Sequence, residues 1–140
     1  RGIEFVTRRI TYNLARIKSG KISKFTLGNI NAKRDWGFAG DYVEAMWQML
    51  QQKEPINYVI ATGESHSVEE FLTLATEYVG LGDWHDVVEI NEANMRPTDI
   101  DDLIGNATKA KEKLNWKPKT NFKELVKLMV DHDMNYYKLK

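Results

Sequence analysis

Apolar side chains recur at helical spacing in five stretches of this chain, which predicts a helix-rich protein. The first helix should cover residues 7–19, with Thr7 as its N-cap and Gly20 in the left-handed position that follows a helix. Its apolar stripe consists of Ile10, Leu14 and Ile17.

Capping patterns predict where the second and third helices begin. Asp41 should cap the second helix, because Glu44 stands three residues later in a capping-box position. Ser67 should cap the third helix, which Gly80 closes. The apolar face of the second helix consists of Val43, Met46, Trp47 and Leu50. The last two helices are expected at residues 108–114 and from residue 120 onward.

Three short stretches predict strands, at residues 24–27, 58–62 and 87–90. Residues 58–62 form a continuous, mostly β-branched run that Gly63 ends, which is typical of a buried strand. These strands cannot all find partners within the chain. Residues 58–62 in particular are typical of a strand that belongs to a sheet located mostly elsewhere.

The amino-acid composition is typical of a single globular domain. The 140 residues are 42% apolar and 29% charged, enough for a real core. No apolar run approaches the roughly 18 residues of a membrane span, and no signal peptide follows the first residue, so we expect no membrane contact. The absence of cysteine excludes disulfides and thiolate metal sites and favours a cytoplasmic protein. Because the first residue is not Met, we expect a cut or processed N-terminus.

Charge is unevenly distributed although the net charge is zero. Residues 1–34 carry an excess of eight positive charges, and the remainder carries an equal negative excess. A basic patch of this kind suits a nucleotide-sugar site or a nucleic acid. The alternative is a solvated basic helix that pairs with acidic side chains elsewhere in the fold. No nucleic-acid-binding motif is present, and the acidic remainder argues against a nucleic-acid partner.

The most informative stretch is residues 33–37, Lys-Arg-Asp-Trp-Gly. The guanidinium of Arg34 offers bidentate hydrogen bonds to a phosphate and a planar face that stacks on a ring. In this interpretation Asp35 holds Arg34 in place and Trp36 forms a wall of the pocket. The alternative is a surface ion pair beside a core tryptophan.

Three further elements suit a phosphorylated ligand. Gly28, beside Leu27, permits close approach of a ligand to the backbone, although an ordinary turn is the alternative. Pro97 favours an extended conformation at Arg96 that presents a guanidinium from a loop, although a salt-bridged structural loop is the alternative. The start of the first helix, which carries Arg8 and Arg9, can direct N–H groups and guanidiniums at an anion.

Other kinds of site lack support in the sequence. The three histidines show no metal-ligand spacing, so we expect no metal site. The glycine-rich dinucleotide fingerprint is missing. Tyr136 and Lys140 do spell Y-x-x-x-K, the pair of short-chain dehydrogenases, but they lie at the end of the chain, outside any sheet or cleft, and we interpret them as a chance match.

The chain resembles the C-terminal part of the GDP-mannose 4,6-dehydratases, a group within the extended short-chain dehydrogenase/reductases. Residues 32–37 together with residues 96–98 distinguish this group from the epimerases. The other matching segments are residues 1–2, 5–10, 27–29, 41–47, 59–64, 66–68 and 114–118. The resemblance implies an α/β fold class. Residues 1–140 are then the helix-rich, substrate-binding portion of a Rossmann-like fold with few short strands, and the N-terminal cofactor-binding portion is absent from the chain.

The resemblance also implies roles for individual residues. Arg9, at a position that is usually Lys, lies on the path of the sugar nucleotide, and Leu27 and Gly28 approach the nucleotide through their backbone. Arg34 binds the GDP part, and Arg96 binds its diphosphate.

Two more residues carry implied roles. Asp99, at a position that is usually Glu, contacts the ribose or base side of the nucleotide. Arg1 reaches the phosphate of the cofactor NADP and adjoins a neighbouring subunit.

Enzymes of this group use NADP to oxidise GDP-mannose at C4, eliminate water across C5–C6 and return hydride to C6, on the way to GDP-fucose. Their Thr, Glu, Tyr and Lys catalytic residues lie in the N-terminal portion, so we expect no catalytic residue here and no activity from the chain alone. The implied partners are GDP-mannose or GDP, the N-terminal half of the enzyme, and further subunits of a homodimer or homotetramer. The alternative is a non-catalytic interaction or oligomerisation module.

Overall fold

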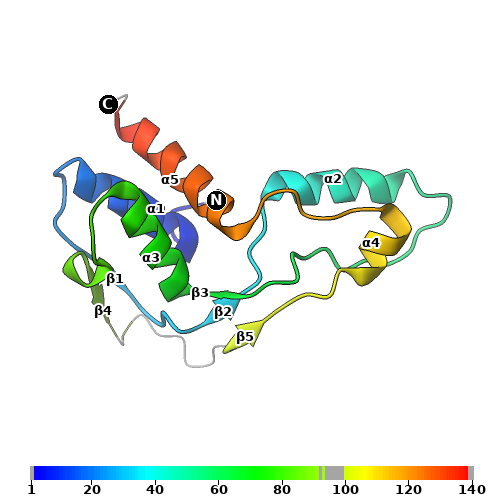
Figure 1. Cartoon of the computed structure of the whole chain (residues 1–140), viewed down its shortest axis with the longest axis horizontal. Coiled ribbons are helices and arrows are strands. Elements are labelled where there is room, and N and C mark those ends of the chain that lie inside the picture. The colour runs from blue at the N-terminus through cyan, green and yellow to red at the C-terminus, as the bar shows by residue number, and fades with distance from the viewer. Residues whose placement is uncertain (1, 92, 94–99, 139–140) are drawn as a thin grey trace.

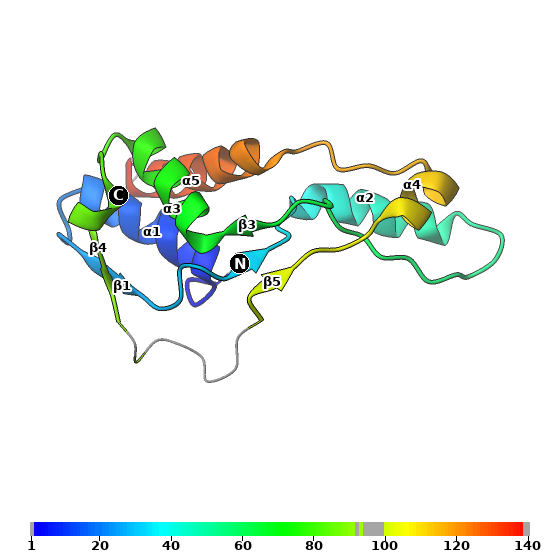
Figure 2. The same ribbon diagram turned by 60° about the horizontal axis from the view of Figure 1, so that its bottom comes forward.

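The computed structural model describes residues 2–91, 93 and 100–138, which form an elongated molecule with two groups of helices (Figure 1). The larger helix group contains α1 (Val6–Lys18), α3 (Val68–Val79) and α5 (Phe122–Lys138). The smaller helix group contains α2 (Ala39–Leu50) and α4 (Thr108–Leu114). Figure 2 shows from a second direction that α2 and α4 lie at one end of the molecule, away from α1 and α3.

The strands form two small sheets. In the first sheet, β1 (Phe25–Leu27) pairs in parallel with β4 (Val88–Ile90), and the 3-10 turn η1 (Trp84–Asp86) precedes β4. In the second sheet, β2 (Lys33–Arg34) lies between antiparallel β3 (His66–Ser67) and parallel β5 (Asp102–Leu103). The expected α/β class with few short strands is confirmed, as are the strands near residues 24–27 and 87–90.

Local sequence signals predicted one helix start and two helix ends correctly. The hydroxyl of Ser67 accepts a hydrogen bond from the backbone N–H of Glu70 at 3.0 Å, so the expected cap of α3 is present. Gly20 after α1 and Gly80 after α3 have φ angles of 70° and 72°, in the left-handed region that favours glycine.

The predicted caps of α1 and α2 are wrong. Both helices begin after a phenylalanine, Phe5 and Phe38, without a side-chain cap. Thr7 lies inside the first turn of α1. The carboxylate of Asp41 accepts hydrogen bonds from the distant backbone N–H groups of Lys119 (3.0 Å) and Thr120 (2.9 Å). A tertiary contact has therefore replaced the local one.

The larger core lies between α1, α3, α5 and the first sheet. Its buried residues include Ile10, Leu14, Phe25, Leu27, Phe71, Leu72, Val88, Val126 and Val130. A separate, smaller core joins α2 to α4 and consists of Ala45, Ala110, Leu114 and Trp116, with Tyr42, Met49, Tyr58 and Ile60 packed against it. Among the described residues, no helix combines the length and the apolar character that crossing a bilayer requires.

Residues 58–62 do not form the predicted strand, and neither sheet in the described part of the chain includes them. The backbone N–H and C=O groups of residues 58–61 take part in none of the hydrogen bonds found in the described part of the chain. Tyr58 and Ile60 pack against the smaller core, whereas Val59 is 53% exposed.

The apolar face predicted on α2 is present but exposed. Val43, Met46, Trp47 and Leu50 are 61%, 58%, 62% and 82% exposed. The helix buries a different face, that of Ala45, against the smaller core. The spacing of apolar residues therefore predicted the apolar face of α2 correctly, but it did not show that this face stays uncovered within the chain.

A buried ion pair joins α1 to α5. The carboxylate of Asp133 is fully buried and lies 2.8 Å from the guanidinium of Arg8, and it also accepts a hydrogen bond from the Thr11 hydroxyl at 2.7 Å. Arg8 thus follows the alternative interpretation of the basic first helix, in which it pairs with an acid elsewhere in the fold. Removal of one partner would leave the other charge buried and unpaired, which is costly.

We therefore expect Asp133→Ala to lower the free energy of unfolding by about 3–5 kcal/mol. Asp131→Ala, on the same helix, removes an acid that accepts a hydrogen bond from the exposed Tyr78 hydroxyl, and it should have a much smaller effect. Urea denaturation of the two variants measures the difference. Equal losses from both would show that the Arg8 contact contributes no special stability.

Close packing between residues 61 and 105 generates a second prediction. A Cβ atom added to Gly105 would lie 2.2 Å from the Cβ of Ala61, which cannot rotate away. We expect Gly105→Ala to cost about 1–3 kcal/mol of stability by overpacking. Ala61→Gly should recover part of that loss in the double variant, and strictly additive losses in thermal or urea denaturation would contradict this packing.

Candidate functional site

The structure brings Arg9 and the Leu27–Gly28 pair together. Arg9 lies in the first turns of α1, and its guanidinium donates a hydrogen bond to the hydroxyl of Thr26 at 3.3 Å. Thr26 is the middle residue of β1, and Gly28 follows that strand directly. A cation from α1 therefore lies beside β1, close in the chain to the Leu27–Gly28 pair.

Leu27 contributes to this region through its backbone. Its side chain is buried in the larger core, and its carbonyl accepts a hydrogen bond from the backbone N–H of Asn91 at 2.8 Å. Because β1 and β4 are parallel, Gly28 and Asn91 leave the sheet at the same edge. In α/β proteins, ligands bind outside the carboxyl ends of parallel strands, and this edge is such a place.

Arg34 lies on the central strand of the second sheet. Its guanidinium donates hydrogen bonds to its neighbour's carbonyl, that of Lys33, at 2.6 Å, and to the carbonyl of Ile100. Its Cα faces His66 on β3 and Leu103 on β5. The side chain is half-buried and is held against the residues that lead into β5.

The carboxylate of Asp35 binds partners that the sequence did not indicate. Its carboxylate accepts four hydrogen bonds from elsewhere in the chain. The donors are the Thr62 hydroxyl (2.6 Å) and the backbone N–H groups of Thr62 (2.9 Å), Gly63 (3.0 Å) and Gly105 (3.1 Å). Partial desolvation raises the pKa of Asp35, but these hydrogen bonds outweigh it and hold the pKa below the ordinary value of 3.8.

Trp36 is mainly a core residue, as the alternative interpretation expected. Its ring stacks on Phe122, with centroids 6.0 Å apart and planes at 10°, and meets Phe71 edge-on. It also lines a small cavity of about 190 Å³, together with Thr62, Glu64, His66 and residues 118–122.

Sequence reasoning gave no role to His66. Its ring stacks on Phe122 at 3.8 Å between centroids, and its Nδ1 lies 2.9 Å from a carboxylate oxygen of Glu70. A carboxylate oxygen of Glu64 lies 3.6 Å from Nε2. The sequence did offer a signal for this contact. His66 directly precedes the Ser67 cap, and Glu70 lies four residues later, one turn into the helix. The described residues contain no cluster of histidine and acidic side chains that fits a metal ion.

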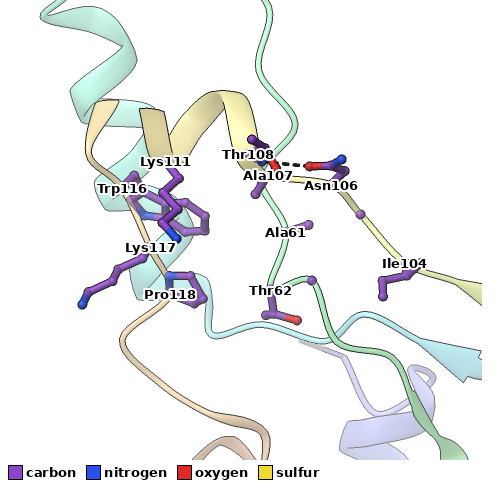
Figure 3. Close-up of a pocket in the computed structure, with 12 residues that line it drawn as sticks. Ala61, Thr62, Ile104, Asn106, Ala107, Thr108, Lys111, Trp116, Lys117 and Pro118 are labelled. Carbon is purple, nitrogen blue, oxygen red and sulfur yellow. Dashed lines mark hydrogen bonds between the residues drawn. The ribbon is translucent and has the colours of Figure 1, made fainter. Parts of the chain in front are cut away.

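A larger cavity, of about 510 Å³, is shown in Figure 3, and Arg9, Leu27, Gly28 and Arg34 do not line it. It opens between the segments around residues 62 and 105 and the start of α4. Its lining consists of residues 61–63 and 104–108 with Lys111, Trp116, Lys117 and Pro118. It therefore adjoins the hydrogen bonds of Asp35 rather than the predicted ligand-binding residues.

Arg1, Arg96 and Asp99 lie outside the described residues, so their roles remain predictions. The described residues near the 94–99 segment are attached to the candidate site on both sides. Asn91 donates to the carbonyl of Leu27, and Ile100 accepts from Arg34.

Comparison with known proteins identifies the family of the chain. The family model described as GDP-mannose 4,6 dehydratase matches residues 1–129. The chain is 60% identical over 138 residues to GDP-mannose 4,6 dehydratase 1 of Arabidopsis thaliana, covering 99% of this chain and 38% of that protein. It is 47% identical to GDP-mannose 4,6 dehydratase of Homo sapiens, covering 96% of this chain and 40% of that protein.

A solved structure shows the same fold. The structure of RMD from Pseudomonas aeruginosa complexed with NADPH superimposes with a TM-score of 0.87 at 18% identity, over 97% of this chain and 44% of that one. The chain thus spans about two fifths of the length of these relatives. The matched family model and the high identities together show that this chain belongs to the GDP-mannose 4,6-dehydratase family.

Proposed function

We propose that this chain is the sugar-nucleotide-binding portion of a GDP-mannose 4,6-dehydratase, and that it binds the GDP part of GDP-mannose. The observation that carries the proposal is the contact between the Arg9 guanidinium and β1, at the edge where Gly28 and Asn91 leave the first sheet. A guanidinium is suited to a diphosphate because its N–H groups donate bidentate hydrogen bonds to phosphate oxygens.

Arg34 supplies the second cation of the proposed site. Its attachment to the carbonyl of Ile100 limits the orientations that the guanidinium samples, so less side-chain entropy is lost on binding. Arg96 and Asp99, if placed as the family resemblance implies, complete the contacts to the diphosphate and to the ribose or base.

The dehydration itself is proposed for the complete enzyme, with NADP as its cofactor and a soluble, cytoplasmic location. NADP would accept hydride from the hexose and return it. Arg1 is the residue proposed to reach the cofactor, and we assign no catalytic role to any residue of this chain. We accordingly expect the chain by itself not to convert GDP-mannose.

An interaction surface accompanies the proposed site. The exposed apolar face of α2 (Val43, Met46, Trp47 and Leu50) and the unpaired backbone of residues 58–61 both belong to the smaller helix group. Unpaired strand-like backbone and large exposed apolar side chains are normally covered by a partner. We propose that the cofactor-binding portion of the enzyme is that partner. Self-association through the same surface, as a dimer or tetramer, is the alternative.

The binding proposal predicts that GDP binds this chain and that UDP binds less tightly. Arg34→Ala should weaken GDP binding at least tenfold, because charge-assisted hydrogen bonds to phosphate contribute about 1.5–3 kcal/mol. Calorimetric titration at low salt measures both nucleotides.

Arg16→Ala is the matched control for that titration. It removes the same charge from a residue that contacts Asn13 and the ring of Tyr12. Equal weakening by the two variants would indicate unspecific attraction to the basic region, and a lack of GDP binding by a folded chain would contradict the proposal.

Whichever partner covers the α2 face in the complete enzyme, the isolated chain leaves that face uncovered, so we predict that the chain by itself associates as its concentration rises. Met46→Lys combined with Leu50→Lys should abolish this association and leave GDP affinity unchanged, since both side chains point into solvent. Leu128→Lys, at an exposed apolar position on α5, is the control and should change neither property. Sedimentation velocity distinguishes these cases, and persistent association of the double variant would exclude α2 as the contact.

A further inference from the structure

We infer that Asp35 is a positioning residue of the sugar-nucleotide site: its carboxylate acts as an internal anion that fixes the strand of Arg34 against two distant segments of the chain. This inference rests on the proposed function for its link to GDP. Its structural content stands on the hydrogen bonds alone.

The hydrogen bonds of Asp35 connect three segments. From β2, the carboxylate reaches the turn at residues 62–63 and the backbone at residue 105, at sequence separations of 27, 28 and 70 residues. The backbone N–H of Asp35 also donates to the carbonyl of Leu103 at 2.9 Å. Both the main chain and the side chain of this residue therefore hold β2 to the β5 side of the molecule.

The orientation of Arg34 depends on this attachment. Arg34 immediately precedes Asp35, pairs with Leu103 in the β2–β5 ladder, and donates to the carbonyl of Ile100. The ladder is only two residues long, so its backbone hydrogen bonds alone hold it weakly. The four hydrogen bonds of the neighbouring carboxylate fasten one end of this short ladder and so fix the direction in which the guanidinium points.

The donors around Asp35 form a nest that suits an anion. Three backbone N–H groups and one hydroxyl point at a single carboxylate, and converging N–H groups of this kind bind anions elsewhere in proteins. Gly63 has a φ of 83°, and Gly105 has no room for a Cβ beside Ala61. Both glycines therefore provide a backbone that other residues would distort. An asparagine in place of Asp35 would turn an N–H₂ group toward some of these donors and leave them unsatisfied.

Space for a substitute anion adjoins the nest. Thr62, Gly63 and Gly105 all line the cavity of about 510 Å³ shown in Figure 3. A small carboxylate such as formate can therefore reach the donors when the Asp35 side chain is removed. Added formate therefore tests whether the donors need only a carboxylate nearby or need one that is covalently attached to β2.

The experiment compares the intact chain with Asp35→Ala and Asp35→Asn. Each is titrated with GDP, and amide hydrogen exchange is followed by NMR at Thr62, Gly63 and Gly105. We expect both variants to bind GDP about tenfold more weakly and to exchange faster at these three amides, with α3 amides unchanged. Added formate should restore slow exchange and GDP affinity to Asp35→Ala, and chloride at the same ionic strength should not.

Asp101→Asn is the control, because it removes an exposed charge near the same ladder. It should leave exchange and GDP affinity unchanged. If Asp35→Ala and Asp35→Asn keep slow exchange at the three amides, or if formate has no effect, the inference is overturned whether or not GDP binds. If exchange behaves as expected but the unmodified chain binds no GDP, the proposed function fails and the positioning of Arg34 by Asp35 stands as a structural fact only.

Discussion

Two aspartates, Asp35 and Asp41, hydrogen-bond the segments that run between the two helix groups. The chain passes between the larger and the smaller helix group four times (Figure 1). Asp35 joins three of these passages, at residues 35, 62–63 and 105. Asp41 holds the fourth through the backbone N–H groups of Lys119 and Thr120, and its own carbonyl accepts from the indole of Trp116. Since the two cores are separate, these polar contacts add to the short β3–β2–β5 ladder and to local apolar packing in fixing the passages relative to one another.

Of the basic residues among the first 34, Arg8 has a structural role and Arg9 belongs to the proposed ligand site. Arg8 forms the buried ion pair with Asp133, which holds α1 against α5. Its neighbour Arg9 lies on a different side of the helix and contacts β1. Adjacent positions on a helix are separated by about 100°, so one arginine faces α5 while the next faces the sheet edge. The positive excess of residues 1–34 is thus explained by an ion pair inside the fold for Arg8 and by a proposed ligand site for Arg9. Only the packing of α1 shows which arginine belongs to which.

Features set by near neighbours in the sequence were predictable, and features set by distant ones were not. The cap of α3 and the glycines after α1 and α3 depend on residues a few positions apart, and each was predicted correctly. The cap predicted at Asp41 was wrong and the hydrogen-bond partners of Asp35 were not predicted, because each carboxylate binds donors between 27 and 79 residues away. The apolar face of α2 was recognised by its period, but a period says nothing about what covers that face. The contact of Arg9 with β1 is likewise long-range, because Thr26 lies 17 residues further along the chain, and no local pattern indicated it.

The distribution of exposed surface shows how the proposed site and the proposed partner surface relate. Arg9, Gly28 and Arg34 belong to the larger helix group and to the strands beside it, whereas the exposed face of α2 and residues 58–61 belong to the smaller one. A partner that covers α2 therefore does not compete with a ligand held by Arg9. Ala61 is the residue before Thr62, however, and Thr62 gives two hydrogen bonds to Asp35. Pairing of residues 58–61 with a partner strand would order the backbone that leads into Thr62, and through Asp35 it would steady Arg34. In the proposed function, assembly with the cofactor-binding portion and orientation of the GDP-binding arginine are thus linked through one carboxylate.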